Sequence, residues 1–316
     1  MPKGFSRRSL LGKGIAAGLG AALAASPAKA ARWAQEVEAR YPPTGRFADT
    51  ARGRIHYDRR GEGPPVVLIH GASGNLRDFT FAFADRLAGA GFEAIAVDRP
   101  GHGHSDRGSA RTPQLQAAML SEAMAAIGVE RPVVLGHSMG GAVAAAWAVG
   151  HEVAALVGVA AVLYPWPGGE NRFHAAAASP VLGPAAAVMA RKRLEEGGAE
   201  NAVRWIFSPQ RPPAGYAEHV GAPLAVRPAT FRANGEDVSG VNEALQGMVG
   251  RYADLQVPVA LVHGTADSIV PVESHAARFA REVPSARFTR LKGIGHMPHH
   301  VEASAVIDAV LQVAGR

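Results

Sequence analysis

The pentapeptide Gly136-His137-Ser138-Met139-Gly140 constrains the fold of this chain more than any other stretch. It follows a short apolar run, Pro132 to Leu135, and opens a small-residue stretch, Gly141 to Val149, that is expected to be helical. A serine between two glycines at a strand-to-helix junction is typical of a nucleophile elbow, a strained turn that exposes the serine and leaves no room for side chains two residues away. The N-terminal end of such a helix would stabilise an anion formed at Ser138.

Two other apolar runs also end in glycine-containing loops. Val66 to Ile69 leads into His70-Gly71-Ala72-Ser73-Gly74, and Ile95 to Val97 leads into a loop from Asp98 to Ser105. Strand, loop and helix then repeat in order along the chain. That rhythm predicts a parallel sheet with helices on both faces.

Taken together, these elements resemble the α/β-hydrolase superfamily over roughly residues 46 to 314. The resemblance rests on His70-Gly71, the Asp98 to Ser105 loop, the pentapeptide, His263-Gly264-Thr265-Ala266-Asp267 and Gly295-His296. It implies an α/β fold with a mostly parallel eight-stranded sheet, flanked by helices, and an inserted helical cap. It also implies that the Asp98 to Ser105 loop supports the site, with Asp98 and Arg99 in structural ion pairs.

The family orders its catalytic triad as nucleophile, acid and histidine, and the chain offers Ser138, Asp267 and His296 in that order. Asp267 lies just beyond an apolar run, Val257 to Val262, where a carboxylate can reach a histidine. The competing acid position, after Leu163, has no carboxylate before Glu170.

The catalytic histidine is chosen among the 13 histidines by its position along the chain. Arg287 to Leu291 is predicted to be the last strand, and His296 falls in the loop that follows it. His299 and His300 come after Pro298, where we expect surface or capping residues. Histidines at 296, 299 and 300 also fit metal ligation, but no acidic or further histidine cluster accompanies them in the sequence, so no metal is predicted.

The expected chemistry is acyl transfer to Ser138. His296 would take the serine proton, Asp267 would hold the imidazole, and the backbone N–H groups of Ala72 and Met139 would form the oxyanion hole. No cofactor is needed. Relatives that open epoxides or displace halide use an aspartate at the elbow, so the serine favours ester, lactone, thioester, amide or carbon–carbon bond hydrolysis. An acyltransferase or perhydrolase with the same triad, and a ligand-binding relative without catalysis, stay open.

The strand rhythm breaks after Leu163, and residues 164–253 are the predicted cap between core segments 31–163 and 254–316. Helices are expected at residues 175–178, 185–192, 199–207 and 241–252. Aromatic residues of this insertion are candidates for a substrate pocket or for the core of the cap: Trp166, Phe173, Trp205, Phe207 and Phe231. An aromatic pocket favours a small apolar substrate as the protein's partner.

The N-terminus resembles a twin-arginine export signal. Arg7 and Arg8 precede an apolar stretch from Ile15 to Ala25, and Ala28-Lys29-Ala30 forms a small-x-small cleavage site. The stretch is shorter than the ~20 residues that a membrane span requires. Residues 1–30 are therefore predicted to be removed, leaving a periplasmic or secreted protein with no stable membrane anchor.

Composition agrees with an exported enzyme rather than a nucleic-acid-binding protein. The formal charge is +6, but five cations and no acid lie in the first thirty residues, so cleavage would leave about +1. No basic run with interleaved aromatic residues predicts nucleic-acid binding. The chain has no cysteine, which excludes disulfides and a lipid-modified cysteine. The oligomeric state is not indicated by the sequence.

Overall fold

An eight-stranded sheet forms the centre of the protein in a computed structural model that describes residues 27–167 and 172–316. The strands lie in the order β1-β2-β4-β3-β5-β6-β7-β8. Neighbours from β4 to β8 pair in parallel, whereas β1 with β2 and β2 with β4 pair antiparallel. This arrangement confirms the expected mostly parallel, eight-stranded sheet. The strands are β1 (Arg46–Thr50), β2 (Gly53–Arg60), β3 (Pro65–Ile69), β4 (Glu93–Val97), β5 (Val133–His137), β6 (Ala155–Val159), β7 (Val259–Gly264) and β8 (Arg287–Leu291).

The central strands are buried along almost their whole length because helices cover both faces of the sheet. Alternate residues of β3 illustrate this. Val67 and Ile69 belong to one buried cluster, with α5 and α6, whereas Val66 and Leu68 belong to another, with α4 and α14. The helices of the core are α3 (Arg77–Thr80), α4 (Phe83–Gly89), α5 (Pro113–Ala126), α6 (Met139–Gly150), α12 (Ala276–Glu282), α13 (Pro298–Val301) and α14 (Ala303–Val313).

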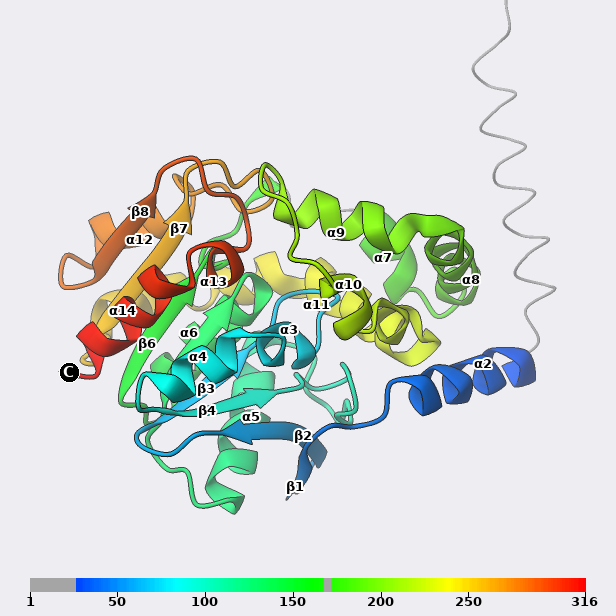
Figure 1. Ribbon diagram of the computed structural model, residues 1–316, viewed down its shortest axis with the longest axis horizontal. Helices are drawn as coiled ribbons and strands as arrows, with labels where there is room; N and C mark the ends of the chain where they lie inside the picture. The colour runs from blue at the N-terminus through cyan, green and yellow to red at the C-terminus, as the bar shows by residue number, and fades with distance from the viewer. Residues whose placement is uncertain (1–26, 168–171) are drawn as a thin grey trace, which may run out of the picture.

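The segment between β6 and β7 contains only helical elements among its described residues. They are α7 (Arg172–Ala178), α8 (Gly183–Arg193), the π-helical turn η2 (Leu194–Gly198), α9 (Ala199–Phe207), α10 (Tyr216–His219), the 3₁₀ turn η3 (Ala222–Val226), α11 (Pro228–Gln246) and the 3₁₀ turn η4 (Val249–Asp254). Helices α7, α8 and α9 lie together at the end of the molecule opposite β8 and α14 (Figure 1). We call residues 164–253 the cap.

Within the cap, α9 has the predicted bounds of residues 199–207, whereas the helix predicted at residues 241–252 differs. The long helix α11 ends at Gln246, and the segment after Met248 forms a 3₁₀ turn rather than the end of a helix over residues 241–252. Pro228 stands in the first turn of α11, where a missing N–H is tolerated, and this allows the helix to begin 13 residues before the predicted start.

The N-terminal helix α2 (Pro27–Arg40) precedes the sheet and lies beside the cap (Figure 1). Its Val37, with Tyr41, packs against Leu224 of the cap turn η3. Most of the predicted export signal, residues 1–26, lies outside the described residues. In the part of the chain that is described, no single helix combines the length and apolarity of a membrane span. One sharply bent pair, residues 172–178 with 183–207, meets that test by length and composition.

Candidate active site

Ser138 occupies the sharp turn between β5 and α6. Its backbone has φ of 52° and ψ of −120°, a conformation that is strained for any residue with a side chain. A Cβ added to Gly136 would overlap the carbonyl oxygen of Gly140, and one added to Gly140 would overlap that of Ile69. The two glycines therefore allow the turn to form against β3, as the sequence pattern predicts for an elbow.

Asp267 and His296 meet beyond the carboxyl ends of β7 and β8. His296 Nδ1 lies 2.7 Å from Asp267 Oδ2, and His263 Nε2 donates to the same oxygen over 3.1 Å. The other oxygen, Oδ1, accepts the backbone N–H groups of Ile269 and Val270, both at 2.9 Å. Burial alone would raise the pKa of Asp267, but the hydrogen bonds from the two histidines hold it well below its usual value. The carboxylate is thus ionised and fixed in orientation.

His137 links the elbow to the loop that carries His296. Its Nε2 donates a 2.9 Å hydrogen bond to the carbonyl oxygen of His296, and the two imidazole rings lie 4.9 Å apart between centroids. Ser138 Oγ and His296 Nε2 have no hydrogen-bond partner among the described residues. Hydrogen bonds between catalytic groups are commonly long in ligand-free enzymes and shorten when substrate binds.

Two backbone N–H groups beside Ser138 are free to bind an anion. Those of Ala72 and Met139 donate no hydrogen bond within the described part of the chain. The neighbouring Ser73 has a positive φ of 54°, and its N–H is held by Asn234 Oδ1 of the cap helix α11 at 2.6 Å. The cap thus fixes the loop that carries Ala72.

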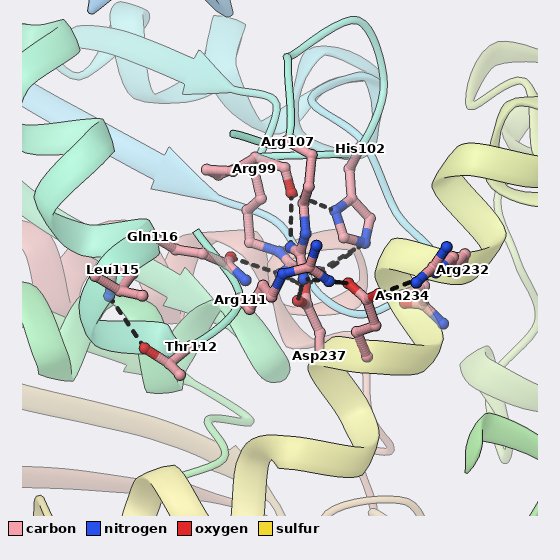
Figure 2. A network of polar contacts seen from close by, with 12 residues as sticks. Arg99, His102, Arg107, Arg111, Thr112, Leu115, Gln116, Arg232, Asn234 and Asp237 are labelled. Carbon is pink, nitrogen blue, oxygen red and sulfur yellow. Dashed lines mark hydrogen bonds and ion pairs between the residues drawn. The ribbon is translucent and has the colours of Figure 1, made fainter. Parts of the chain in front are cut away.

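A buried arginine, Arg99, supports that loop, and Figure 2 shows it among Gln116, His102 and Asp237. Arg99 has no exposed surface, and its guanidinium donates to the carbonyl oxygens of His70 at 3.0 Å and Gly71 at 3.2 Å. Its charge is balanced by Asp237 of α11 at 2.7 Å, and Gln116 accepts a further hydrogen bond at 2.9 Å. The position of the candidate oxyanion loop therefore depends on an ion pair between core and cap.

Asp98 and His70 complete this support. Asp98 accepts hydrogen bonds from His56 Nδ1 and from the N–H groups of Leu76 and His104, at 2.7 to 2.8 Å. His70 Nε2 accepts the N–H of Arg99, so Nδ1 carries the proton and donates to Gly71 O. Burial lowers the pKa of His70 to about 4, which keeps its ring neutral.

The expectation that His299 and His300 are surface or capping residues is wrong. His299 is buried, His300 is partly buried, and both direct Nε2 at Asp78 of α3. The argument that no acidic residue accompanies these histidines fails for the same reason, because Asp78 is distant in the sequence and meets them only in the folded chain. Asp78, His299 and His300 lie close enough together to be considered as metal ligands.

The candidate pocket residues are spread over the cap. Phe207 is buried and its ring contacts those of Tyr216 and His300. Trp166 is half-buried beside His275. Trp205 and Phe173 are 60% and 50% exposed, so neither lies in the core of the cap, and their role in a substrate pocket stays a prediction. On α9 the buried positions are Val203 and Phe207, four residues apart, and Trp205 points away from that face.

Two surface cavities of about 1060 and 1050 Å³ accompany the cap, and neither is lined by Ser138, Asp267 or His296. The first lies between α9, the 208–215 loop and α10. The second lies between α2, the 101–107 loop and α8. Phe231 lies outside both linings and packs against Ala177 and Ala187 in the core of the cap.

The strand order, the elbow and the acid–histidine pair agree with a known fold family. The sequence pattern described as alpha/beta hydrolase fold matches residues 64–303. The chain belongs to this family. The esterase of Exiguobacterium antarcticum has the same fold, with a TM-score of 0.66 at 19% identity over 86% of this chain and 100% of the esterase.

Two curated relatives of this hydrolase-fold protein align over shorter stretches. The dihydrolipoyllysine-residue acetyltransferase component of an acetoin cleaving system from Cupriavidus necator is 44% identical over 33% of this chain and 28% of its own length. Haloalkane dehalogenase 2 of Mycobacterium tuberculosis is 37% identical over 34% of this chain and 38% of its own. The chain thus matches well under half the length of these relatives, whose reactions differ.

Several residues of the site were not found from the sequence. Asp78, Tyr216, Asn234 and Asp237 reach the site from α3 or from the cap. Each is a single polar residue in a helix, and no local pattern separates such a residue from an exposed one. His263 stood in the recognised segment before Asp267, but its contact with that carboxylate depends on a turn of the loop between them.

Proposed function

We propose that this α/β-hydrolase-fold protein is a serine hydrolase that cleaves an ester or related acyl bond of a small apolar substrate. The observation that carries the proposal is the strained Ser138 at the elbow, together with the Asp267–His296 pair beyond the ends of β7 and β8 of the same sheet. A serine in that conformation costs about 1–3 kcal/mol, which a purely structural turn would avoid by using glycine.

In the proposed reaction, Ser138 Oγ attacks the substrate carbonyl and passes its proton to His296 Nε2. Asp267 keeps the other ring proton on Nδ1 and stabilises the imidazolium. The oxyanion binds to the N–H groups of Ala72 and Met139. Collapse of the tetrahedral intermediate transfers the proton from His296 to the departing alcohol and leaves an acyl-serine. Water, deprotonated by His296, then attacks the acyl-serine and releases the acid and free Ser138.

Preorganisation supports the oxyanion role. The loop that carries Ala72 is held by Asn234 through Ser73 and by Arg99 through the carbonyl oxygens of His70 and Gly71. Donors that are already fixed need not reorganise during the reaction. One such donor is typically worth roughly 3–4 kcal/mol of transition-state stabilisation.

Other reactions remain as second candidates because they use the same acyl-serine or the same triad. An acyltransferase or perhydrolase would replace water by an alcohol, a thiol or a peroxide, and a carbon–carbon hydrolase would attack a ketone. Halide displacement, the reaction named for one relative, is disfavoured because it needs a carboxylate at the elbow position, where this chain has Ser138. A non-catalytic ligand-binding role predicts no turnover at all.

Export is the other part of the proposal. Arg7, Arg8, the apolar stretch and the Ala28-Lys29-Ala30 site support delivery through the twin-arginine route to the periplasm or beyond. That route carries folded proteins, and a cysteine-free hydrolase can fold completely before export.

The test is hydrolysis of p-nitrophenyl esters of graded acyl length, aryl esters and lactones by the mature protein. Ser138→Ala should abolish turnover and also abolish covalent labelling by a fluorophosphonate. Ser285→Ala, which changes an exposed serine, should alter neither. Turnover that persists in Ser138→Ala would refute the serine mechanism, and a wild-type protein that binds esters without cleaving them would favour the ligand-binding alternative.

A further inference from the structure

Asp78 is a buried carboxylate that Ser138, His296 and Asp267 do not use. Its side chain is 8% exposed, and three groups donate hydrogen bonds to it. Tyr216 Oη donates to Oδ1 at 2.7 Å, and His300 Nε2 donates to the same oxygen at 2.8 Å. His299 Nε2 lies 3.2 Å from Oδ2. A buried ion with this many donors is expected to be rigid, because each lost bond would leave charge without a partner.

The groups around Asp78 come from four separate parts of the molecule. Asp78 itself belongs to α3, which follows the candidate oxyanion loop. His299 and His300 belong to the single turn α13, which begins two residues after His296. Tyr216 begins the cap helix α10. The fourth part is β5, whose last residue, His137, precedes Ser138.

We call Asp78, Tyr216, His299 and His300 the Asp78 cluster. His137 lies between this cluster and the candidate triad. Its ring centroid is 4.5 Å from that of His299 and 4.9 Å from that of His296. Its Nε2 hydrogen is used by His296 O, so Nδ1 bears a lone pair, and that atom is buried without a partner 3.9 Å from Asp78 Oδ2. The backbone of His296 is therefore fixed from two sides, through α13 and through His137.

The protonation states of Asp78, His299 and Tyr216 follow from their burial and from their hydrogen bonds. Burial alone would raise the pKa of Asp78, but His299 and His300 hold it well below its usual value. Burial lowers the pKa of His299 to about 4, and burial beside Asp78 raises the pKa of Tyr216 well above its usual value. At neutral pH the Asp78 carboxylate is thus ionised, and its donors His299 and Tyr216 are neutral.

Asp78, His299 and His300 lie close enough together to hold a metal ion, but two features of the cluster fit direct hydrogen bonds better than metal ligation. A histidine that binds a metal through one ring nitrogen normally donates the hydrogen on the other to a carboxylate or carbonyl. His299 Nδ1 is buried and has no partner among the described residues. The 2.8 Å separation of His300 Nε2 from Asp78 Oδ1 is that of a direct hydrogen bond.

We propose that Asp78 is a positioning residue for His296. By anchoring His299 and His300, it fixes α13 and hence the preceding loop that carries His296. By accepting the Tyr216 hydroxyl, it makes the same loop depend on the docking of the cap. The inference rests on the proposed serine hydrolase function, because it assigns Asp78 to the orientation of the general base.

The first test compares Asp78→Ala with Asp85→Ala, which removes an exposed carboxylate on the next helix. Asp78→Ala is expected to lower kcat about 10²-fold, the usual cost of a 1 Å misplacement, with little change in KM. The rate of fluorophosphonate labelling of Ser138 should fall in parallel. Asp85→Ala should leave both unchanged. An Asp78→Ala protein that folds, as judged by circular dichroism, and labels at the wild-type rate would overturn the proposal.

A double-mutant cycle separates positioning from general loosening of the fold. In a His296→Ala background, Asp78→Ala should cost almost nothing further in residual activity, because its effect acts through His296. Additive losses would show that Asp78 acts elsewhere. Tyr216→Phe, which keeps both histidine bonds, should lower kcat by less than Asp78→Ala and provides a variant that folds if Asp78→Ala does not. A wild-type labelling rate in Tyr216→Phe would overturn the link to the cap.

Two further outcomes keep the inference distinct from the proposed function. If Ser138→Ala retains turnover, the serine mechanism fails. If Ser138→Ala is inactive but Asp78→Ala is fully active, only the positioning role fails.

A metal titration tests the alternative use of the same residues. Binding of one Zn²⁺ per chain by calorimetry, lost in His300→Ala, would overturn the proposal that Asp78 is a hydrogen-bonded anchor.

Discussion

His137 Nε2 donates a 2.9 Å hydrogen bond to the carbonyl oxygen of His296, although the two residues are 159 positions apart. The residue before the candidate nucleophile thus holds the backbone of the candidate general base. A motion of the histidine loop would be transmitted to the elbow through this contact. The relative positions of Ser138 and His296 are therefore a property of tertiary packing rather than of either loop alone.

Asp267→Asn should reduce kcat by about 10⁴-fold while the protein stays folded. The amide can still accept the N–H groups of Ile269 and Val270 through its oxygen, which turns its NH₂ toward His296 Nδ1. The imidazole would then carry its proton on the wrong nitrogen. Steady-state kinetics on a p-nitrophenyl ester measure the loss, and Asp308→Asn, an exposed change on α14, is the control. Near-normal turnover would place the acid elsewhere.

Asp237→Asn should destabilise the protein by about 3–5 kcal/mol, because it leaves the fully buried guanidinium of Arg99 without its counter-ion. It should also slow labelling of Ser138, since Arg99 holds the loop of Ala72. Glu236→Gln tests the neighbouring carboxylate, which pairs with the exposed Arg111 and Arg232 and, at 3.4 Å, with the partly buried Arg107, and should cost less, about 1 kcal/mol. Urea denaturation of both variants checks the contrast, and equal losses would contradict it.

Acid should weaken the fold as the pH falls below about 6.5. Burial lowers the pKa of His275 to about 3, whereas an unfolded histidine titrates near 6.5. Between these values the unfolded chain binds more protons. The stability that neutral His275 contributes is therefore complete above about pH 6.5 and is lost as the pH falls toward 3, by ~1.4 kcal/mol per pH unit.

His275→Asn provides the measurement. The amide oxygen can replace Nδ1 as acceptor for the N–H groups of Leu163 and Tyr164, but it does not titrate. Urea denaturation at pH 7, 6, 5 and 4.5 should show a flatter pH dependence in the variant than in the wild type. Parallel curves would mean that His275 does not remain neutral in the folded protein.

Trp166→Ala should change acyl-chain preference more than Trp205→Ala. Trp166 is half-buried in the segment after β6, beside His275, whereas Trp205 is 60% exposed. A methylene-sized change in an apolar pocket alters relative kcat/KM by about 1–3 kcal/mol. Specificity profiles over a series of esters test this, with fluorophosphonate labelling to report an intact triad. Unchanged profiles in Trp166→Ala would exclude this side chain from the pocket.

Replacing Arg7 and Arg8 by lysine should leave an unprocessed precursor in the cytoplasm, because the twin-arginine route requires the arginine pair. Cell fractionation and mass spectrometry of the N-terminus give the readout. Lys13→Arg, which keeps the charge outside the pair, is the matched control. Normal export of the lysine variant would exclude this route.

The sequence by itself predicted the central strands and the elbow from local patterns, and it predicted the three candidate catalytic residues from their positions together with the order that the resembled family uses. Buried parallel strands require continuous apolar runs, and the elbow requires glycines at Gly136 and Gly140. Only the tertiary structure decided what surrounds those residues. Asp78 meets His299 and His300 across more than 200 residues of chain, and Asp237 of the cap balances Arg99 of the core. No local pattern encodes such pairs, because a buried charge is stable only beside a partner that the fold brings to it.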